Sequence, residues 1–238
     1  MIASLPMYAR PQLEGPIHRF WALIQEALSD SGINAPAELD QNIAGVDAWL
    51  RPDLLLSQTC GAPFRDHLHG KVQLVGTPDA RIPGCPPGYY QSVFIARDLI
   101  TWGDAISGPW AANEPGSQSG TYAARLRAPS PLTDPVWSGS HLTSIDMVST
   151  GQVDWASIDA VTWDIATQLG TTEGLIVWDR SEPTPALPYI TALTTEAKLI
   201  RYAVKAAIKQ LAPQDQRALC VYDLVDIPAD DYLAVPKP

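Results

Sequence analysis

The stretch PWAANEPGSQSGTYAARL, residues 109–126, passes from a short apolar run through a turn rich in Ser and Gly into a helical pattern. The same order, a strand-like run followed by a helix, recurs along the chain, for example at 53–68, 153–169 and 189–211. Strands that alternate with helices favour an α/β fold with mostly parallel sheets. We therefore expect an α/β protein.

Two such runs of strands and helices are joined by extended segments near residues 98–107 and 183–188. This double connection predicts two lobes. Lobe I would comprise 1–105 and 186–238, lobe II would comprise 106–185, and the two connecting segments would act as hinges. In open parallel sheets, ligands bind where strands lead into helices. The sequence therefore predicts a ligand cleft between the lobes.

Composition narrows the classes of partner. The 238 residues are 46% hydrophobic, and the formal net charge is −10. The chain lacks the basic footprint of nucleic-acid-binding proteins and a polybasic patch for anionic lipid. We find neither a secretory signal at Met1–Met7 nor a transmembrane run, and we expect a soluble protein without bound nucleic acid.

The cysteines do not indicate a metal site. Cys60, Cys85 and Cys220 match neither a disulfide framework nor a zinc pattern, and we expect no metal and no other cofactor. Three free thiols and a Cys60–Cys85 bridge both stay open.

The turn before Tyr122 allows two interpretations. The first N–H groups of a helix have no partner inside it, and the helix dipole favours an anion there. Ser117, Ser119 and Thr121 would add hydroxyl donors, and Gly120 would let a ligand approach the backbone. An ordinary N-cap would use the same residue types.

Several motifs together give a resemblance to a known family. In chain order they are Ser57-Gln58-Thr59-Cys60-Gly61, Gly88-Tyr89-Tyr90-Gln91-Ser92-Val93, Asn113 with Ser117-Gln118-Ser119-Gly120, Gly139-Ser140-His141, Gly151 to Asp159, and Pro183-Thr184-Pro185 with Pro188. The chain resembles the phosphate/phosphite/phosphonate substrate-binding proteins of ABC transporters, within the type II periplasmic-binding-protein class, over roughly residues 2–210.

The resemblance implies a two-lobed fold, hinge closure on a small oxyanion and an ABC permease as a partner. It also implies the site residues. Ser117, Gln118, Ser119, Gly120 and Thr121 would hold the oxyanion, His141 and Asp159 would face the cleft, Ser57 and Thr59 would oppose them from lobe I, and Tyr90 and Ser92 would line the wall. The implied location is periplasmic, and the absent signal peptide keeps a cytoplasmic one open.

Several roles stay open from the residues alone. His141 could donate as an imidazolium or sit neutral at the start of a helix. Asp159 could accept a bond from the far end of a ligand or cap a helix. Trp155 and Trp163 could stack on a ligand ring or pack in the core.

An enzyme finds little support in the sequence. A nucleophile elbow needs Ser at the centre of its motif, where this chain has Gln118, and no Walker lysine follows the glycine. We therefore expect a binding protein rather than an enzyme. The alternatives are a sulfonate or pyrimidine-type ligand on the same fold, or a cytosolic sensor or enzyme derived from it.

Overall fold

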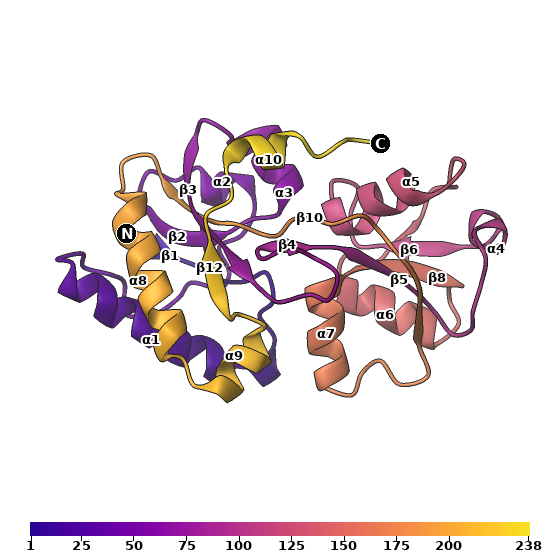
Figure 1. Ribbon diagram of the computed structural model, residues 1–238, viewed down its shortest axis with the longest axis horizontal. Coiled ribbons are helices and arrows are strands. Elements are labelled where there is room, and N and C mark those ends of the chain that lie inside the picture. Colours follow the sequence, from indigo (N-terminus) through magenta and orange to yellow (C-terminus); the bar gives the residue numbers. More distant parts are fainter. The chain divides into compact units, whose positions relative to one another are not determined.

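The computed structural model describes residues 1–238, which form two compact units (Figure 1). Unit 1 consists of Met1–Arg81 and Pro185–Ala234, and unit 2 consists of Ile82–Thr184 with Val235–Pro238. The chain passes from unit 2 back to unit 1 between Thr184 and Pro185. The first division falls after Arg81 instead of near residue 105, because the strand at Ser92–Ala96 pairs within the sheet of unit 2.

Unit 1 contains a five-stranded sheet in the order β1-β2-β11-β3-β12. Its strands are β1 (Ile2–Ala3), β2 (Leu54–Gln58), β3 (Val72–Asp79), β11 (Tyr189–Ala192) and β12 (Asp223–Val225). β1 is parallel to β2, whereas β11 is antiparallel to both β2 and β3, and β12 is antiparallel to β3. β1, β2 and β3 therefore run in one direction.

The helices of unit 1 form two groups. α1 (Glu14–Asp30), α8 (Ala197–Gln210) and α9 (Pro213–Leu219) make one group, and α1 packs on α8 (Figure 1). The other elements are η1 (Pro11–Leu13), α2 (Val46–Trp49), α3 (Gly61–Pro63), the π-helical turn η2 (Phe64–Leu68) and α10 (Ala229–Leu233). α1 buries Ile17, Phe20, Trp21, Ile24 and Leu28, and this helical spacing provides much of the core.

Unit 2 contains a second five-stranded sheet in the order β7-β6-β8-β5-β9. Its strands are β5 (Ser92–Ala96), β6 (Trp110–Ala112), β7 (Val136–Trp137), β8 (Trp155–Asp159) and β9 (Ile176–Arg180). β6 is parallel to β7 and β8, and β5 is antiparallel to β8 and β9. Only β5 runs against the other strands.

The helices of unit 2 are α4 (Trp102–Ser107), the π-helical turn η3 (Gln118–Tyr122) with α5 (Ala123–Arg127), α6 (His141–Ser149) and α7 (Ala160–Gln168). In unit 2, α4 follows the antiparallel strand β5, and the other helices follow the parallel strands β6, β7 and β8. A two-stranded sheet joins β4 (Tyr89–Tyr90) to β10 (Thr184–Pro185). The α/β class is thus confirmed, with antiparallel strands inserted into both sheets. No helix combines the length and apolar composition that crossing a membrane requires.

An aromatic cluster holds the sheet of unit 2 together. The rings of Trp110 and Trp155 stack at 4.9 Å between centroids, with only 9° between their planes. Phe94, Trp102 and Trp178 pack edge-on or tilted around Trp155 and each other. Trp155 is fully buried, and its indole N–H donates to the carbonyl of Ala105 at 2.9 Å. Trp155 is therefore a core residue, and its alternative role as a ligand platform is excluded.

Three of the helices, α2, α4 and α10, are short. The helix α2 has only four residues, and Gly45 adopts a φ of 88° immediately before it. Near the C-terminus the chain folds into α10 and buries Tyr232, whose hydroxyl donates to the carbonyl of Ala186 at 3.0 Å. Residues 98–107, expected as a hinge, contain α4.

Candidate functional site

The strand order of unit 2 brings the predicted loops to one edge of the sheet. β6, β7 and β8 are parallel, so the segments at their carboxyl ends, residues 113–117, 138–140 and 159–160, lie at the same edge. β5 runs in the opposite direction and begins at this edge, where Ser92 pairs with Asp159. Three of the predicted motifs are therefore neighbours in space.

The Ser- and Gly-rich turn is stabilised by its own hydroxyl groups. The Ser117 hydroxyl oxygen accepts a bond from the N–H of Gly120 at 3.0 Å, and the Thr121 hydroxyl donates to the carbonyl of Glu114 at 2.6 Å. The N–H groups of Thr121 and Tyr122 both reach the carbonyl of Ser117. The N-cap interpretation of Ser117 is thus confirmed, and the structure gives Thr121 a bond inside the turn as well.

Ser119 differs from its neighbours in the turn. Its hydroxyl oxygen lies 2.9 Å from Nε2 of His141, the first residue of α6. Its carbonyl accepts a bond from the Ser157 hydroxyl of β8 at 2.6 Å. As the second residue of η3, Ser119 also has no acceptor for its N–H inside the helix. The turn after β6, the start of α6 and the middle of β8 therefore meet at this one residue.

His141 is neutral at ordinary pH. Burial lowers the pKa of its imidazole to about 4, and the main-chain oxygen of Ser157 opposes the shift only in part. Nδ1 is buried, and it makes no hydrogen bond of ordinary geometry with that oxygen or with any other group. The cause is desolvation of the charged ring. Of the two states considered for His141, the structure supports the neutral one.

Asn113 completes the cluster, although the sequence analysis gave it no role of its own. It follows β6 directly, and its Oδ1 is buried without a hydrogen-bond partner. The amide lies so close to Gly120 that a Cβ atom there would collide with Oδ1. Gly120 is therefore required for the amide of Asn113 to rest on the start of the helix.

The remaining predicted residues of unit 2 have structural partners or are buried. One carboxylate oxygen of Asp159 accepts the N–H groups of Val161 at 2.7 Å and Thr162 at 3.0 Å, so Asp159 caps α7. The N–H of Ser92 donates to the Ser181 hydroxyl at 2.9 Å. Gln118 is buried at the start of η3, and Tyr90 is buried in β4.

In unit 1, the predicted residues lie at the end of β2. The hydroxyl oxygen of Ser57 lies 2.9 Å from that of Ser4 and accepts the indole N–H of Trp49 at 3.2 Å, inside the core. The N–H of Thr59 donates to the carbonyl of Pro188 at 3.1 Å. The three cysteines are free thiols. A ligand role for Ser57 and Thr59 stays a prediction.

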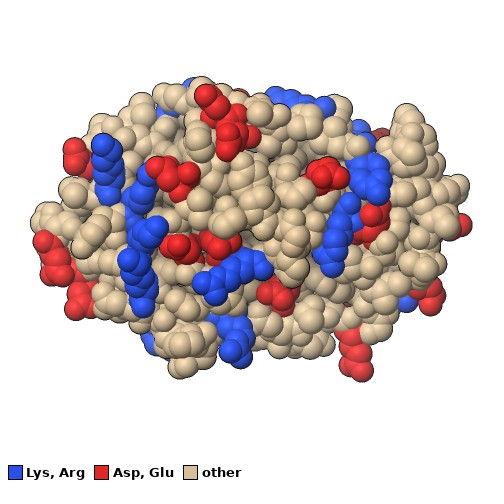
Figure 2. Space-filling view, viewed as in Figure 1, with Lys and Arg blue, Asp and Glu red and all other residues tan.

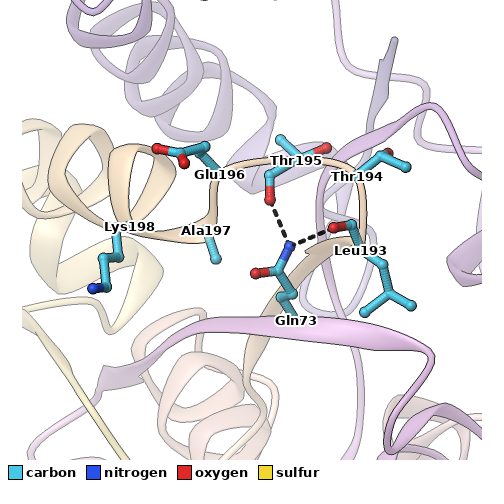
Figure 3. Close-up of a pocket in the computed structure, with 7 residues that line it drawn as sticks. All are labelled: Gln73, Leu193, Thr194, Thr195, Glu196, Ala197 and Lys198. Carbon is cyan, nitrogen blue, oxygen red and sulfur yellow. Dashed lines mark hydrogen bonds between the residues drawn. The ribbon is translucent and has the colours of Figure 1, made fainter.

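A cavity of about 380 Å³ lies elsewhere, beside the start of α8 (Figure 3). Gln73 extends toward the loop between β11 and α8, and its amide donates to the carbonyls of Leu193 and Thr195. The amide nitrogen of Gln73 is thus already hydrogen-bonded to the main chain of this loop. None of the predicted ligand residues lines this cavity.

Basic side chains gather on α8, as the column at the left of Figure 2 shows. They are Lys198, Arg201, Lys205 and Lys209. Arg201 is paired with Asp226, and Lys205 lies 3.5 Å from Asp223. Half of this stripe is therefore neutralised locally, as is typical of a solvated helix face.

Sequence and fold comparisons give different results. No family profile and no curated protein sequence matches the chain. The fold is similar to that of PhnD1 from Prochlorococcus marinus, solved with methylphosphonate, with a TM-score of 0.73 at 14% identity over 97% of this chain and 94% of that one. A binding-protein component of a phosphonate ABC transporter from Pseudomonas aeruginosa gives 0.67 at 14% identity, over 98% and 82%.

A third similar structure is a histidine kinase sensor domain described as similar to periplasmic binding proteins. Its TM-score is 0.57 at 13% identity, over 95% of this chain and 97% of that one. Identities this low establish the fold alone. The chain has the two-sheet α/β fold of the type II periplasmic binding proteins over nearly its whole length.

Proposed function

We propose that the protein binds a small tetrahedral oxyanion, of the phosphonate or phosphate class, at the strand-end cluster of unit 2. The observation that carries the proposal is the contact between Ser119 and His141, which joins two predicted motifs at one point. The similarity to PhnD1, solved with methylphosphonate, supports the ligand class.

The chemistry of the cluster suits an oxyanion. A neutral imidazole carries one N–H, and its tautomer sets the direction of the bond to Ser119. With the proton on Nε2, the His141 ring donates to Ser119, and the Ser119 hydroxyl keeps its own proton for the ligand. The N–H of Ser119 is a second donor. Each charge-assisted bond contributes roughly 1.5–3 kcal/mol.

Calorimetric titration tests the proposal. Methylphosphonate, phosphite and inorganic phosphate are titrated into the protein, with a pyrimidine and an amino acid as unrelated ligands. Ser119→Ala should weaken oxyanion binding at least tenfold, and Gly120→Val should abolish it. Ser149→Ala is the matched control, because its hydroxyl bonds only within the end of α6. Binding of the unrelated ligands alone, or an unchanged affinity in Ser119→Ala, would refute the proposal.

We further propose that binding serves ABC-type uptake, with a permease as the partner and without catalysis. The similarity to a transporter component from Pseudomonas aeruginosa supports this role. A sensor is the alternative, since a sensor domain shares the fold. Deletion of the gene should impair growth on a phosphonate as the sole phosphorus source. Unimpaired uptake with an altered transcriptional response would favour the sensor.

A further inference from the structure

The outer face of α8 carries an unusual concentration of positive charge. Over Ala197–Gln210 the helix has four cations and no carboxylate, in a chain whose formal net charge is −10 (Figure 2). The cations follow one another at spacings of three or four residues, at Lys198, Arg201, Lys205 and Lys209. Like charges at this spacing destabilise a helix. Helix stability therefore does not account for the pattern.

Local pairing neutralises only the middle of this basic stripe. The two middle cations are paired with Asp226 and Asp223, which belong to β12 and the residue after it. Lys198 and Lys209, at the two ends, form no ion pair within the chain. They lie about 16 Å apart along the helix axis, from the rise per residue of an α-helix. The uncompensated charge is thus concentrated at two points.

An apolar groove lies between these two lysines. Its volume is about 380 Å³, and all the residues that line it belong to α8. Tyr202 is 70% exposed, and Ala206 and the aliphatic stems of the cations provide the rest of the apolar lining. The opposite face of α8 is buried and packs on α1. The groove is therefore a preformed surface with an apolar centre and a cation at each end.

We propose that this face docks a short acidic segment of a partner protein, whose carboxylates pair with Lys198 and Lys209 and whose apolar side chain packs on Tyr202. Charge complementarity selects this occupant. An anionic membrane or a nucleic acid presents closely spaced charges, which would also meet the carboxylates beside the middle of the stripe. The inference does not rest on the proposed function, because no predicted ligand residue lines the groove.

Selection from a library of random peptides tests the proposal. Peptides of about 15 residues, a length that spans the stripe as a helix, are selected on the unaltered protein. Those that also bind Lys198→Glu are discarded. The retained peptides should carry acidic residues on both sides of an apolar one. A retained set without acidic residues, or the absence of any retained peptide, would overturn the proposal.

Titration of one retained peptide by fluorescence anisotropy provides the quantitative test. Lys209→Glu and Tyr202→Ala should each weaken binding about tenfold, and added salt should weaken it further. Lys71→Glu is the matched control and should leave the affinity unchanged, because Lys71 is an exposed lysine of unit 1 outside α8. Equal affinity of the unaltered protein and Lys209→Glu would contradict the pairing.

The other possible occupants are measured in parallel. The probes are vesicles that contain phosphatidylglycerol, duplex DNA, and the protein alone in a sedimentation experiment. Binding to vesicles or DNA, or self-association, that is lost in Lys209→Glu while no acidic peptide binds would assign the face to that occupant and overturn the proposal. Lys198, Tyr202 and Lys209 are exposed, so the variants should fold, and circular dichroism checks this.

Discussion

Acidification should destabilise unit 2 through the single residue His141. The pKa of its imidazole falls from the ordinary value of 6.5 to about 4 because burial disfavours the charged ring. In the unfolded chain the ring takes up a proton near its ordinary pKa, whereas in the folded chain it resists until about pH 4. The unfolded state therefore binds more protons in this window, and stability falls as the pH falls through it.

The magnitude follows from the two values. A difference of one pKa unit corresponds to about 1.4 kcal/mol, so His141 should remove up to about 3 kcal/mol between about pH 7 and about pH 4. That loss is a large part of the stability of an ordinary domain. Below about pH 4 the contribution of His141 should level off, because both states are then protonated.

Urea denaturation of the unaltered protein and of His141→Asn, followed over this pH range, tests the reasoning. Carboxylates that lose their charge affect both proteins equally, so the difference between the two curves reports on His141. The unaltered protein should lose about 3 kcal/mol more than the variant on acidification. His18→Asn, at an exposed position of α1, should follow the unaltered protein. Parallel curves for the unaltered protein and His141→Asn would contradict the lowered pKa of His141.

Three further outcomes are expected. Gly120→Ala should destabilise the protein by about 1–3 kcal/mol, because the new Cβ atom would collide with the side chain of Asn113. In a double-mutant cycle of thermal unfolding, the added substitution Asn113→Ala should recover much of this loss, whereas additive effects of the two substitutions would exclude the steric contact. Trp155→Ala should cost about 3–5 kcal/mol in urea denaturation and reduce the near-ultraviolet circular dichroism, and a loss under about 1 kcal/mol would contradict its core position. Asp215→Asn should lower the free energy of unfolding by about 1 kcal/mol or less, because Arg19 is largely exposed. Since Arg19 lowers the pKa of Asp215, the stabilisation by the ion pair is present above the ordinary pKa of the carboxyl group and is lost on acidification. A loss of stability that does not depend on pH would contradict the ion pair.

The α/β class could be predicted because each strand-to-helix unit leaves a local signature. The run at Trp110–Ala112 is apolar, its turn is rich in small polar residues, and the chain then continues into the helical segments η3 and α5. The division into units could not be fully predicted, because β5 is a strand whose partners, β8 and β9, lie far along the chain. Sheet membership depends on those distant pairings, and a strand-like run such as Ser92–Ala96 has the same composition in either unit.

The site shows the same limit at the scale of single residues. Ser119 and His141 belong to motifs, and the structure joins them at 2.9 Å. Asn113 belongs to the same pattern, but its significance depends on a buried oxygen that nothing in the chain reaches. That property arises from the approach of one turn to Gly120, and residue type alone does not encode it.

Capping and ligand binding were competing interpretations of one turn, and the hydrogen bonds show why both can hold. Ser117 and Thr121 use their hydroxyls within the turn, which fixes its shape. Ser119 lies between them and bonds across to His141 instead. Ser117 and Thr121 lie on either side of Ser119 and are held by bonds within the turn. A ligand that accepts bonds from Ser119 therefore meets a preorganised donor and does not have to order the turn. Preorganisation of this kind lowers the entropic cost of binding, so we expect the capping residues to affect affinity through the shape of the turn even though they donate nothing to the ligand.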